Sequence, residues 1–372
     1  MQVQKFQIIS RNEMNSSPSD FSLEGGELFD AQKVLDDPTI SLYCLEPKSN
    51  EAIFVKTPPD IHLNKVPFYA TAQFEHAVQA IKVSYDTLYQ LADQVDLDDR
   101  WLILIYNIGR SGTTVTSAAF GQVENVISFS EPEVFTQLVQ MRDFSGSNDA
   151  LIGKLTAACI RLTCKQSAPK QQPIWALKFT SHACDLVDLI CQSFPIAKCL
   201  FLYRNAEPWF DSYMRAFSMY LSPEVIKEQW SWCKSAIRMV DAYPISDPNE
   251  IPDEIAIGLI MGLMWLNNMD ICYQMIEAGH PILPVRYEDL KADPLPVMEK
   301  IFEYCGVPPV DERALAEVFA TDSQAGTGIA QDKISQKKWD FDPELLVTLH
   351  QVIAEHPVIN TVDYRFPGTL TV

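Results

Sequence analysis

Short apolar runs alternate with longer segments of helical spacing through the middle of this 372-residue chain. Each run is continuous and rich in branched or aromatic residues, which is typical of a buried strand. Strands alternating with helices of this length predict an α/β fold of three layers, with a central parallel sheet flanked by helices. The predicted strands cover residues 101–106, 128–134, 174–179, 198–203 and 281–287, and the predicted helices begin near residues 115, 150, 185, 205, 255 and 294.

The first part of the chain has a different pattern. Residues 15–20 have the composition of a loose tail, and two short β-like runs follow at 40–45 and 52–56. The apolar spacing over residues 74–95 predicts an amphipathic helix. We therefore expect residues 1–97 to be an N-terminal extension and residues 98–372 to be the α/β domain, with a helical insert around 205–280.

The first predicted strand leads into a turn of small residues that carries one arginine. A strand, such a turn and a helix N-terminus together make an anion site, because free backbone N–H groups point at the ligand with the helix dipole behind them. The Walker and dinucleotide patterns are both missing, so an ordinary strand-to-helix connection is an equal alternative for this turn alone. The anion-binding set would be Gly109, Arg110, Ser111, Gly112, Thr113 and Thr114.

A second polar pair follows a later strand. Arg204 closes the predicted strand 198–203, and Ser212 lies eight residues further, inside the next helix. Asn205 can cap that helix. An arginine at a strand end and a hydroxyl two turns into the following helix can converge on one phosphate.

These segments resemble the sulfotransferase family, which uses 3′-phosphoadenosine 5′-phosphosulfate (PAPS). The run from Gly109 to Thr114 resembles the family's loop for the 5′-phosphosulfate, and Arg204 with Ser212 resembles its 3′-phosphate element. A late strand–helix unit, from Val285 to Val307, is similar as well. The resemblance rests on the order and spacing of these short pieces over residues 101–307. It implies a P-loop-like three-layer fold, PAPS as co-substrate and 3′-phosphoadenosine 5′-phosphate (PAP) as product.

The tyrosylprotein-sulfotransferase branch offers the nearest likeness. By this resemblance Glu131 is the general base, while Lys178 and Arg110 stabilise the transition state. In the tail, Ser323 and Lys338 match positions that enclose the nucleotide, although the run from Gln324 to Gly328 departs from the branch. His182, four residues past Lys178, is the rival base, because cytosolic sulfotransferases use a histidine after this strand.

The resemblance implies transfer of a sulfuryl group to the hydroxyl of a small, lipidic or carrier-bound alcohol. No metal is required, and no clustered ligand set is visible. Two alternatives stay open: a P-loop-type kinase using ATP and Mg²⁺, and a non-catalytic relative that binds the nucleotide. The missing Gly-Lys-Ser/Thr signature speaks against the kinase.

Composition narrows the partners and the compartment. A formal net charge of −20 argues against nucleic acid and polyanionic glycans as partners. Nine scattered cysteines without a Cys-x-x-Cys pair favour buried free thiols in a reducing compartment. The N-terminus has no signal-peptide pattern. The longest apolar run, residues 255–266, is short for a membrane span and predicts a core helix, so a cytoplasmic protein without a transmembrane segment is expected.

Overall fold

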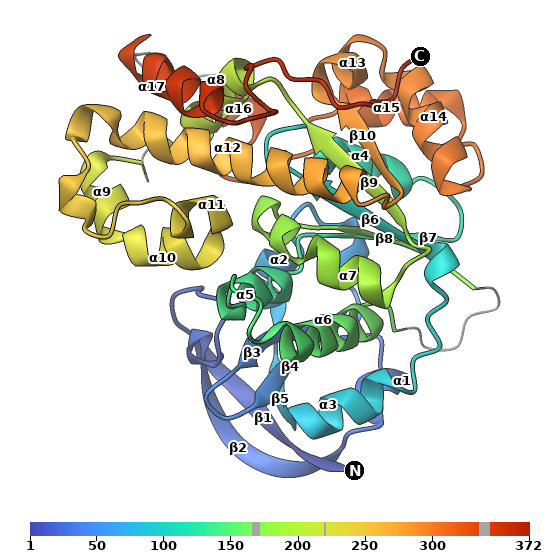
Figure 1. Ribbon diagram of the computed structural model, residues 1–372. Coiled ribbons are helices and arrows are strands. Elements are labelled where there is room, and N and C mark those ends of the chain that lie inside the picture. The colour runs from blue at the N-terminus through green and yellow to red at the C-terminus, as the bar shows by residue number, and fades with distance from the viewer. Residues whose placement is uncertain (166–171, 219–220, 335–342) are drawn as a thin grey trace. The chain divides into compact units, whose positions relative to one another are not determined.

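The computed structural model describes residues 1–165, 172–218, 221–334 and 343–372. The chain forms two compact units (Figure 1). The first contains Met1–Ile103 and Glu124–Ala197, and the second contains Leu104–Val123 and Lys198–Val372.

A five-stranded sheet has the order β10-β9-β6-β8-β7. Both β9/β10 and β7/β8 are parallel pairs, and every residue of β6 is buried. The predicted α/β fold with a parallel sheet and flanking helices is therefore confirmed. The strands are β6 (Leu102–Asn107), β7 (Val126–Ser130), β8 (Ile174–Lys178), β9 (Lys198–Tyr203) and β10 (Ile282–Arg286), and predicted helices appear as α4 (Thr113–Phe120), α6 (Asp149–Thr163), α7 (Val187–Ser193), α8 (Ala206–Phe217) and α14 (Pro294–Cys305).

The first unit also holds an antiparallel sheet in the order β2-β1-β5-β4-β3. The two short β-like runs are confirmed as β3 and β4, but the helix predicted over residues 74–95 is wrong. The strand β5 occupies its centre because Ala80, Ile81 and Val83 are buried between the neighbouring strands, which outweighs their helical spacing. The strands are β1 (Gln2–Arg11), β2 (Phe21–Asp30), β3 (Ile40–Glu46), β4 (Glu51–Lys56) and β5 (Gln79–Ser84), and α2 (Tyr69–His76) and α3 (Tyr85–Ala92) flank β5 in sequence.

The predicted loose tail at residues 15–20 is also wrong. Asp20 is fully buried, and its carboxylate accepts hydrogen bonds from the Tyr43 hydroxyl and from the backbone N–H of Asn15 and Ser17. A buried carboxylate needs such donors, and they hold the segment in one conformation.

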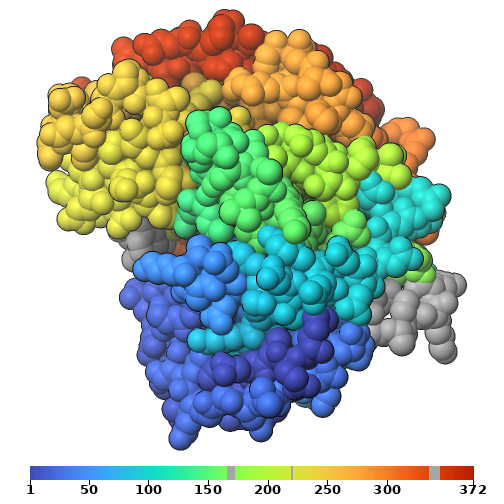
Figure 2. Space-filling model, turned by 60° about the horizontal axis from the view of Figure 1, so that its bottom comes forward, coloured from blue at the N-terminus to red at the C-terminus, as the bar shows by residue number. Residues whose placement is uncertain are grey.

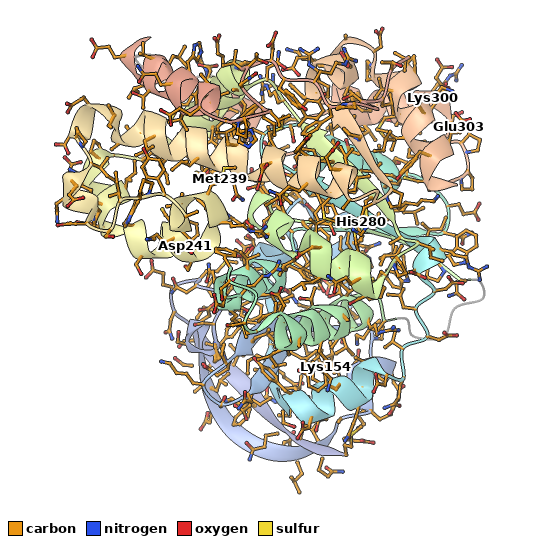
Figure 3. The ribbon with its side chains drawn as sticks, in the orientation of Figure 1. Lys154, Met239, Asp241, His280, Lys300 and Glu303 are labelled. Carbon is orange, nitrogen blue, oxygen red and sulfur yellow. The ribbon has the colours of Figure 1, made fainter. Side chains whose placement is uncertain are left out.

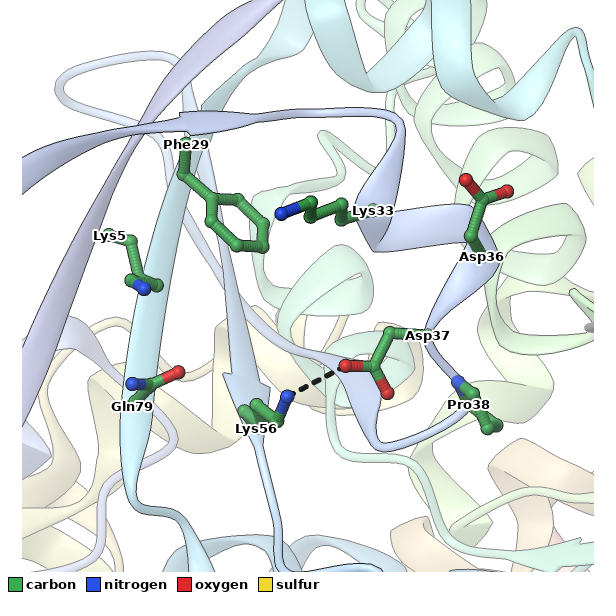
Figure 4. A pocket seen from close by; sticks show the side chains of 8 residues that line it. All are labelled: Lys5, Phe29, Lys33, Asp36, Asp37, Pro38, Lys56 and Gln79. Carbon is green, nitrogen blue, oxygen red and sulfur yellow. Dashed lines mark hydrogen bonds and ion pairs between the residues drawn. The ribbon is translucent and has the colours of Figure 1, made fainter.

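The antiparallel sheet packs on helices of the same unit, α5 (Val134–Met141) and α6. The backbone N–H of Leu45 in β3 donates to the Gln137 side chain at 2.9 Å, and Gln137 in turn donates to the Ser16 carbonyl. Figure 2 shows the N-terminal residues that form this sheet in blue. The same unit contains a cavity of about 550 Å³ in which Lys5 and Lys33 flank the Phe29 ring and Lys56 pairs with Asp37 (Figure 4).

In the second unit the apolar run 255–266 lies inside a much longer helix, α12 (Asp253–Glu277), which packs along α17 (Pro343–Ala354). Of the described helices, α12 alone has the length and apolar composition of a membrane span, and 78% of its apolar window is buried. The backbone N–H of Met239, labelled in Figure 3 on α11 (Arg238–Asp241), donates to the Asn267 side chain in α12 at 3.0 Å. Inside the protein, α12 serves as the predicted core helix.

Candidate active site

The turn between β6 and α4 reverses the chain through left-handed backbone. Gly109, Arg110 and Gly112 have φ angles of 74°, 50° and 83°. The Asn107 side chain accepts the backbone N–H of Gly109 at 2.7 Å and so closes the first part of the turn. Arg110 adopts this conformation at a cost that glycine does not have, roughly 1 kcal/mol. Arg110 is one of five described non-glycine residues with positive φ.

Hydrogen bonds to strand β9 hold the turn in place. The carbonyl of Leu202 accepts the Ser111 hydroxyl at 2.9 Å and the backbone N–H of Ile108 at 3.3 Å. The hydroxyl hydrogen of Ser111 is therefore already donated to Leu202. Ser111 could still bind an anion through its backbone N–H.

Close packing adds a second reason for glycine at position 112. A Cβ atom there would lie 2.9 Å from Cδ2 of Tyr287, in the helix α13 (Tyr287–Ala292). Position 112 thus combines a left-handed φ with a contact that leaves no room for a side chain.

The side chain of Arg110 connects the β6–α4 turn to two segments of the second unit that are distant in sequence. Its Nε donates to the Ser212 hydroxyl in α8 at 3.2 Å, and its NH1 donates to Oε1 of Gln324 at 2.9 Å. The predicted residues Arg110 and Ser212 therefore meet. Gln324 was not predicted as a site residue, and only its place beside Ser323 gave a signal for it.

Arg204 lies beside the same turn. Its NH1 donates to the Arg110 carbonyl at 3.2 Å, and its guanidinium carbon lies 4.6 Å from the centre of the Tyr287 ring. Burial lowers the pKa of Arg204, opposed by Tyr287, Glu288 and Asp211. Its Nε is buried and has no hydrogen-bond partner among the residues that the structure describes. A buried donor of a charged group is costly to leave unpaired, so this nitrogen favours an anionic ligand.

The remaining predicted residues of the second unit lie around this cluster or outside the described ranges. Thr113 and Thr114 open α4, with Thr113 buried. Asn205 stands at the N-cap of α8, but the predicted capping bond is wrong, since its side-chain oxygen accepts from Arg286 at 3.1 and 3.2 Å instead. Ser323 lies in the loop that carries Gln324. Lys338 and Trp339 lie outside the described residues.

The first unit holds Glu131, the predicted general base, and Lys178, the predicted transition-state stabiliser. The Nζ of Lys178, at the end of β8, forms an ion pair with the Glu131 carboxylate, and the Glu131 backbone N–H donates to the Lys178 carbonyl at 2.7 Å. The Lys178 side chain is 2% exposed and that of Glu131 27%. Glu131 has a φ of 61°, so its backbone is left-handed, as is that of Arg110, and such a conformation persists only where the surroundings hold it.

Two further titratable groups lie nearby in sequence. Burial raises the pKa of Glu133 to about 7, against a hydrogen bond from Thr136 and with a contribution from the charge of Glu131. This residue was not predicted, although the Glu-Pro-Glu run contains it. His182, the rival base, is half-buried in the 3₁₀ helix Ser181–Leu186.

In the described ranges no three His, Cys, Asp or Glu side chains are grouped in a way that could hold a metal ion. In the second unit Arg110, Arg204 and Ser212 lie close together through the bonds described above. These are ligands for phosphate or sulfate oxygens.

Comparison with known families identifies the family of the chain. Residues 101–325 match the family model of the sulfotransferase domain, which is more than half of the chain. The chain belongs to the sulfotransferase family. The matched range of this sulfotransferase includes Glu131, Lys178, Arg204 and both sides of the Arg110–Gln324 bond. A search of curated proteins by sequence gives no match.

Solved structures of two other sulfotransferases are similar to this one. The sulfotransferase domain of the Synechococcus PCC 7002 olefin synthase is 13% identical, with a TM-score of 0.35 over 69% of this chain and 95% of that one. The sulfotransferase STF9 from Mycobacterium avium is 13% identical, with a TM-score of 0.41 over 72% and 80%. Similarities this low carry no argument about acceptor or partners.

Proposed function

We propose that this sulfotransferase takes its sulfuryl group from PAPS and transfers it to the hydroxyl of a small, lipidic or carrier-bound alcohol. The observation that carries the proposal is the convergence of Arg110, Arg204 and Ser212 beside the N-terminus of α4, where the buried Nε of Arg204 has no partner within the described part of the chain. Two guanidinium groups and a helix N-terminus form a site for a dianionic phosphate.

The donor would be held by both ends of its ribose. Arg204 and Ser212 would bind the 3′-phosphate, and Tyr287 would keep Arg204 in place beneath it. The backbone N–H groups from Gly109 to Thr114, with the threonine hydroxyls and Arg110, would bind the 5′-phosphosulfate. Ser323 and Lys338 would complete the nucleotide site. We propose the tyrosylprotein branch as the nearest likeness within the family. The net negative charge of the chain disfavours polyanionic acceptors.

In the transfer step the acceptor oxygen forms a bond to sulfur while the bond from sulfur to the 5′-phosphate oxygen breaks. The proton of the acceptor hydroxyl passes to the Glu131 carboxylate, and PAP leaves with the electron pair of the broken bond. A protonated Glu131 no longer balances the charge of Lys178, so that ammonium becomes available to the oxygens on which charge develops. Arg110 offsets charge on the leaving phosphate.

We also place the enzyme in the cytoplasm. The nine cysteines all lie in the described ranges, where each is buried and none forms a disulfide, which suits a reducing compartment. A reducing compartment is where unpaired thiols persist without forming disulfides.

The direct test is release of PAP from PAPS in the presence of a panel of alcohols, each assayed with and without Mg²⁺. We expect PAP formation that depends on one acceptor class and does not require the metal. Transfer from ATP with an absolute requirement for Mg²⁺ would contradict the proposal and support the kinase alternative.

A further inference from the structure

The contact between Arg110 and Gln324 has an unusual chemical character for so acidic a chain. Arg110 is held on two sides by neutral oxygens, the hydroxyl of Ser212 at 3.2 Å and the amide of Gln324 at 2.9 Å. The chain has 49 acidic residues. A carboxylate in either place would bind the guanidinium more strongly, but it would also cancel the charge.

The loop that carries Gln324 does contain a carboxylate, which is turned elsewhere. Asp322 accepts the backbone N–H of Gln324 at 2.9 Å with one oxygen and that of Gln331 at 2.7 Å with the other. Both oxygens therefore close the loop on itself. The carbonyl of Gln324 is fixed as well, because the Thr327 hydroxyl donates to it at 2.7 Å. The loop thus presents a neutral amide oxygen, and not its own carboxylate, to Arg110.

From this arrangement we infer that Gln324 is a positioning residue for Arg110 that orients the guanidinium without neutralising it. The inference rests on the proposed function and deepens it. Arg110 occupies left-handed backbone, at a φ of 50°, and its long side chain needs external contacts to adopt one rotamer. A neutral partner fixes that rotamer without itself adding a countercharge that would compete with the donor's phosphate.

The test compares two substitutions of the same chemistry in the same loop. Gln324→Glu keeps the size and the acceptor oxygen but adds a charge at Arg110. The matched control, Gln331→Glu, adds the same charge at an exposed position seven residues along the chain. PAP affinity is measured by calorimetric titration, and folding is checked by thermal unfolding.

We expect Gln324→Glu to bind PAP about tenfold to a hundredfold more weakly than Gln331→Glu, because the new ion pair competes with the phosphate. Its unfolding temperature should be no lower than that of wild type. Gln324→Leu should weaken binding several-fold in wild type and have no further effect in an Arg110→Ala background, since Gln324 acts through Arg110.

Equal PAP affinity of Gln324→Glu and Gln331→Glu, with wild type binding normally, would overturn the inference alone. So would an undiminished effect of Gln324→Leu in the Arg110→Ala background, which would make Gln324 a direct ligand. Failure of wild type to bind PAP would overturn the proposed function, and the inference with it.

Discussion

Glu131 and Arg110 are the two predicted site residues whose backbone departs from ordinary geometry. Both have positive φ, at 61° and 50°, and such residues cost about 1 to 3 kcal/mol each unless their surroundings hold them. At Glu131 the surroundings are visible: its N–H donates to the Lys178 carbonyl and its carboxylate pairs with the buried Lys178 ammonium. Lys178 therefore fixes both the backbone and the side chain of the proposed base.

This arrangement gives the first prediction. Glu131→Gln should lower kcat about 10²- to 10⁴-fold, the usual contribution of a general base, while PAP affinity stays within about threefold of wild type. The matched control is Glu124→Gln, an exposed carboxylate seven residues earlier in the chain. Steady-state kinetics and PAP titration measure the two quantities. Full activity of Glu131→Gln together with a large loss in His182→Asn would transfer the role to His182.

Glu133 gives a prediction on pH. Its pKa rises from 4.5 to about 7 on folding, chiefly through burial, so between these values the folded state binds a proton that the unfolded state has lost. Stability should therefore fall as the pH rises through this window. A glutamine at position 133 is neutral at every pH, so Glu133→Gln should not lose this stability. The difference in unfolding free energy, variant minus wild type, should therefore increase by about 1 to 2 kcal/mol between roughly pH 5 and roughly pH 8. Urea unfolding at the two pH values measures this, and an equal difference at both would contradict it.

At the scale of elements, the β6–α4 connection depends on Gly112. The position has a φ of 83°, and a Cβ there would approach the Tyr287 ring to 2.9 Å. Gly112→Ala should lower the unfolding free energy by about 1 to 3 kcal/mol and weaken PAP binding, because Tyr287 also supports Arg204.

Gly328→Ala is the control for this change, since its φ is not positive and no atom lies within 4 Å of the added Cβ. Chemical unfolding of both variants gives the comparison. A Gly112→Ala protein as stable as Gly328→Ala would show that the turn does not need glycine.

Elements differ in how far the sequence predicts them. Strands such as β6 and β9 were found because continuous apolar runs with buried side chains leave few alternatives. The strands β1 and β2 were not predicted. Most of β2 is exposed and polar, so its sequence shows neither the two-residue period of a strand nor the 3.6-residue period of a helix. At the site, the residue types and their order indicated Arg110, Arg204 and Ser212, whereas Gln324 depends on a loop fold that no local pattern encodes.

At the scale of the whole chain, the question is whether residues 1–97 are separable from the sulfotransferase domain. The boundary at residue 97 stays a prediction. Within the first unit, Gln137 in α5 bonds to Leu45 and to Ser16, and Lys165 donates to the Asp37 carbonyl at 2.9 Å. These bonds join residues of the N-terminal segment 1–97 to residues that follow the boundary.

Gln137→Ala should therefore lower the unfolding free energy by about 1 to 2 kcal/mol, because it leaves the Leu45 N–H without its partner. The same substitution at Gln140, exposed on the same helix, should be close to neutral. Thermal and urea unfolding measure both. Two neutral substitutions would indicate that the N-terminal sheet contributes nothing at this contact.

The central claim is that the second unit binds the PAPS nucleotide through Arg204, and titration with PAP tests it most directly. Wild type should bind PAP, and Arg204→Ala should bind about a hundredfold more weakly, as expected for a charged contact in a buried site. Arg215→Ala, which removes an exposed arginine paired with Asp211 on α8, should bind as wild type does. Binding of ATP–Mg²⁺ but not of PAP by the wild-type protein would contradict the account.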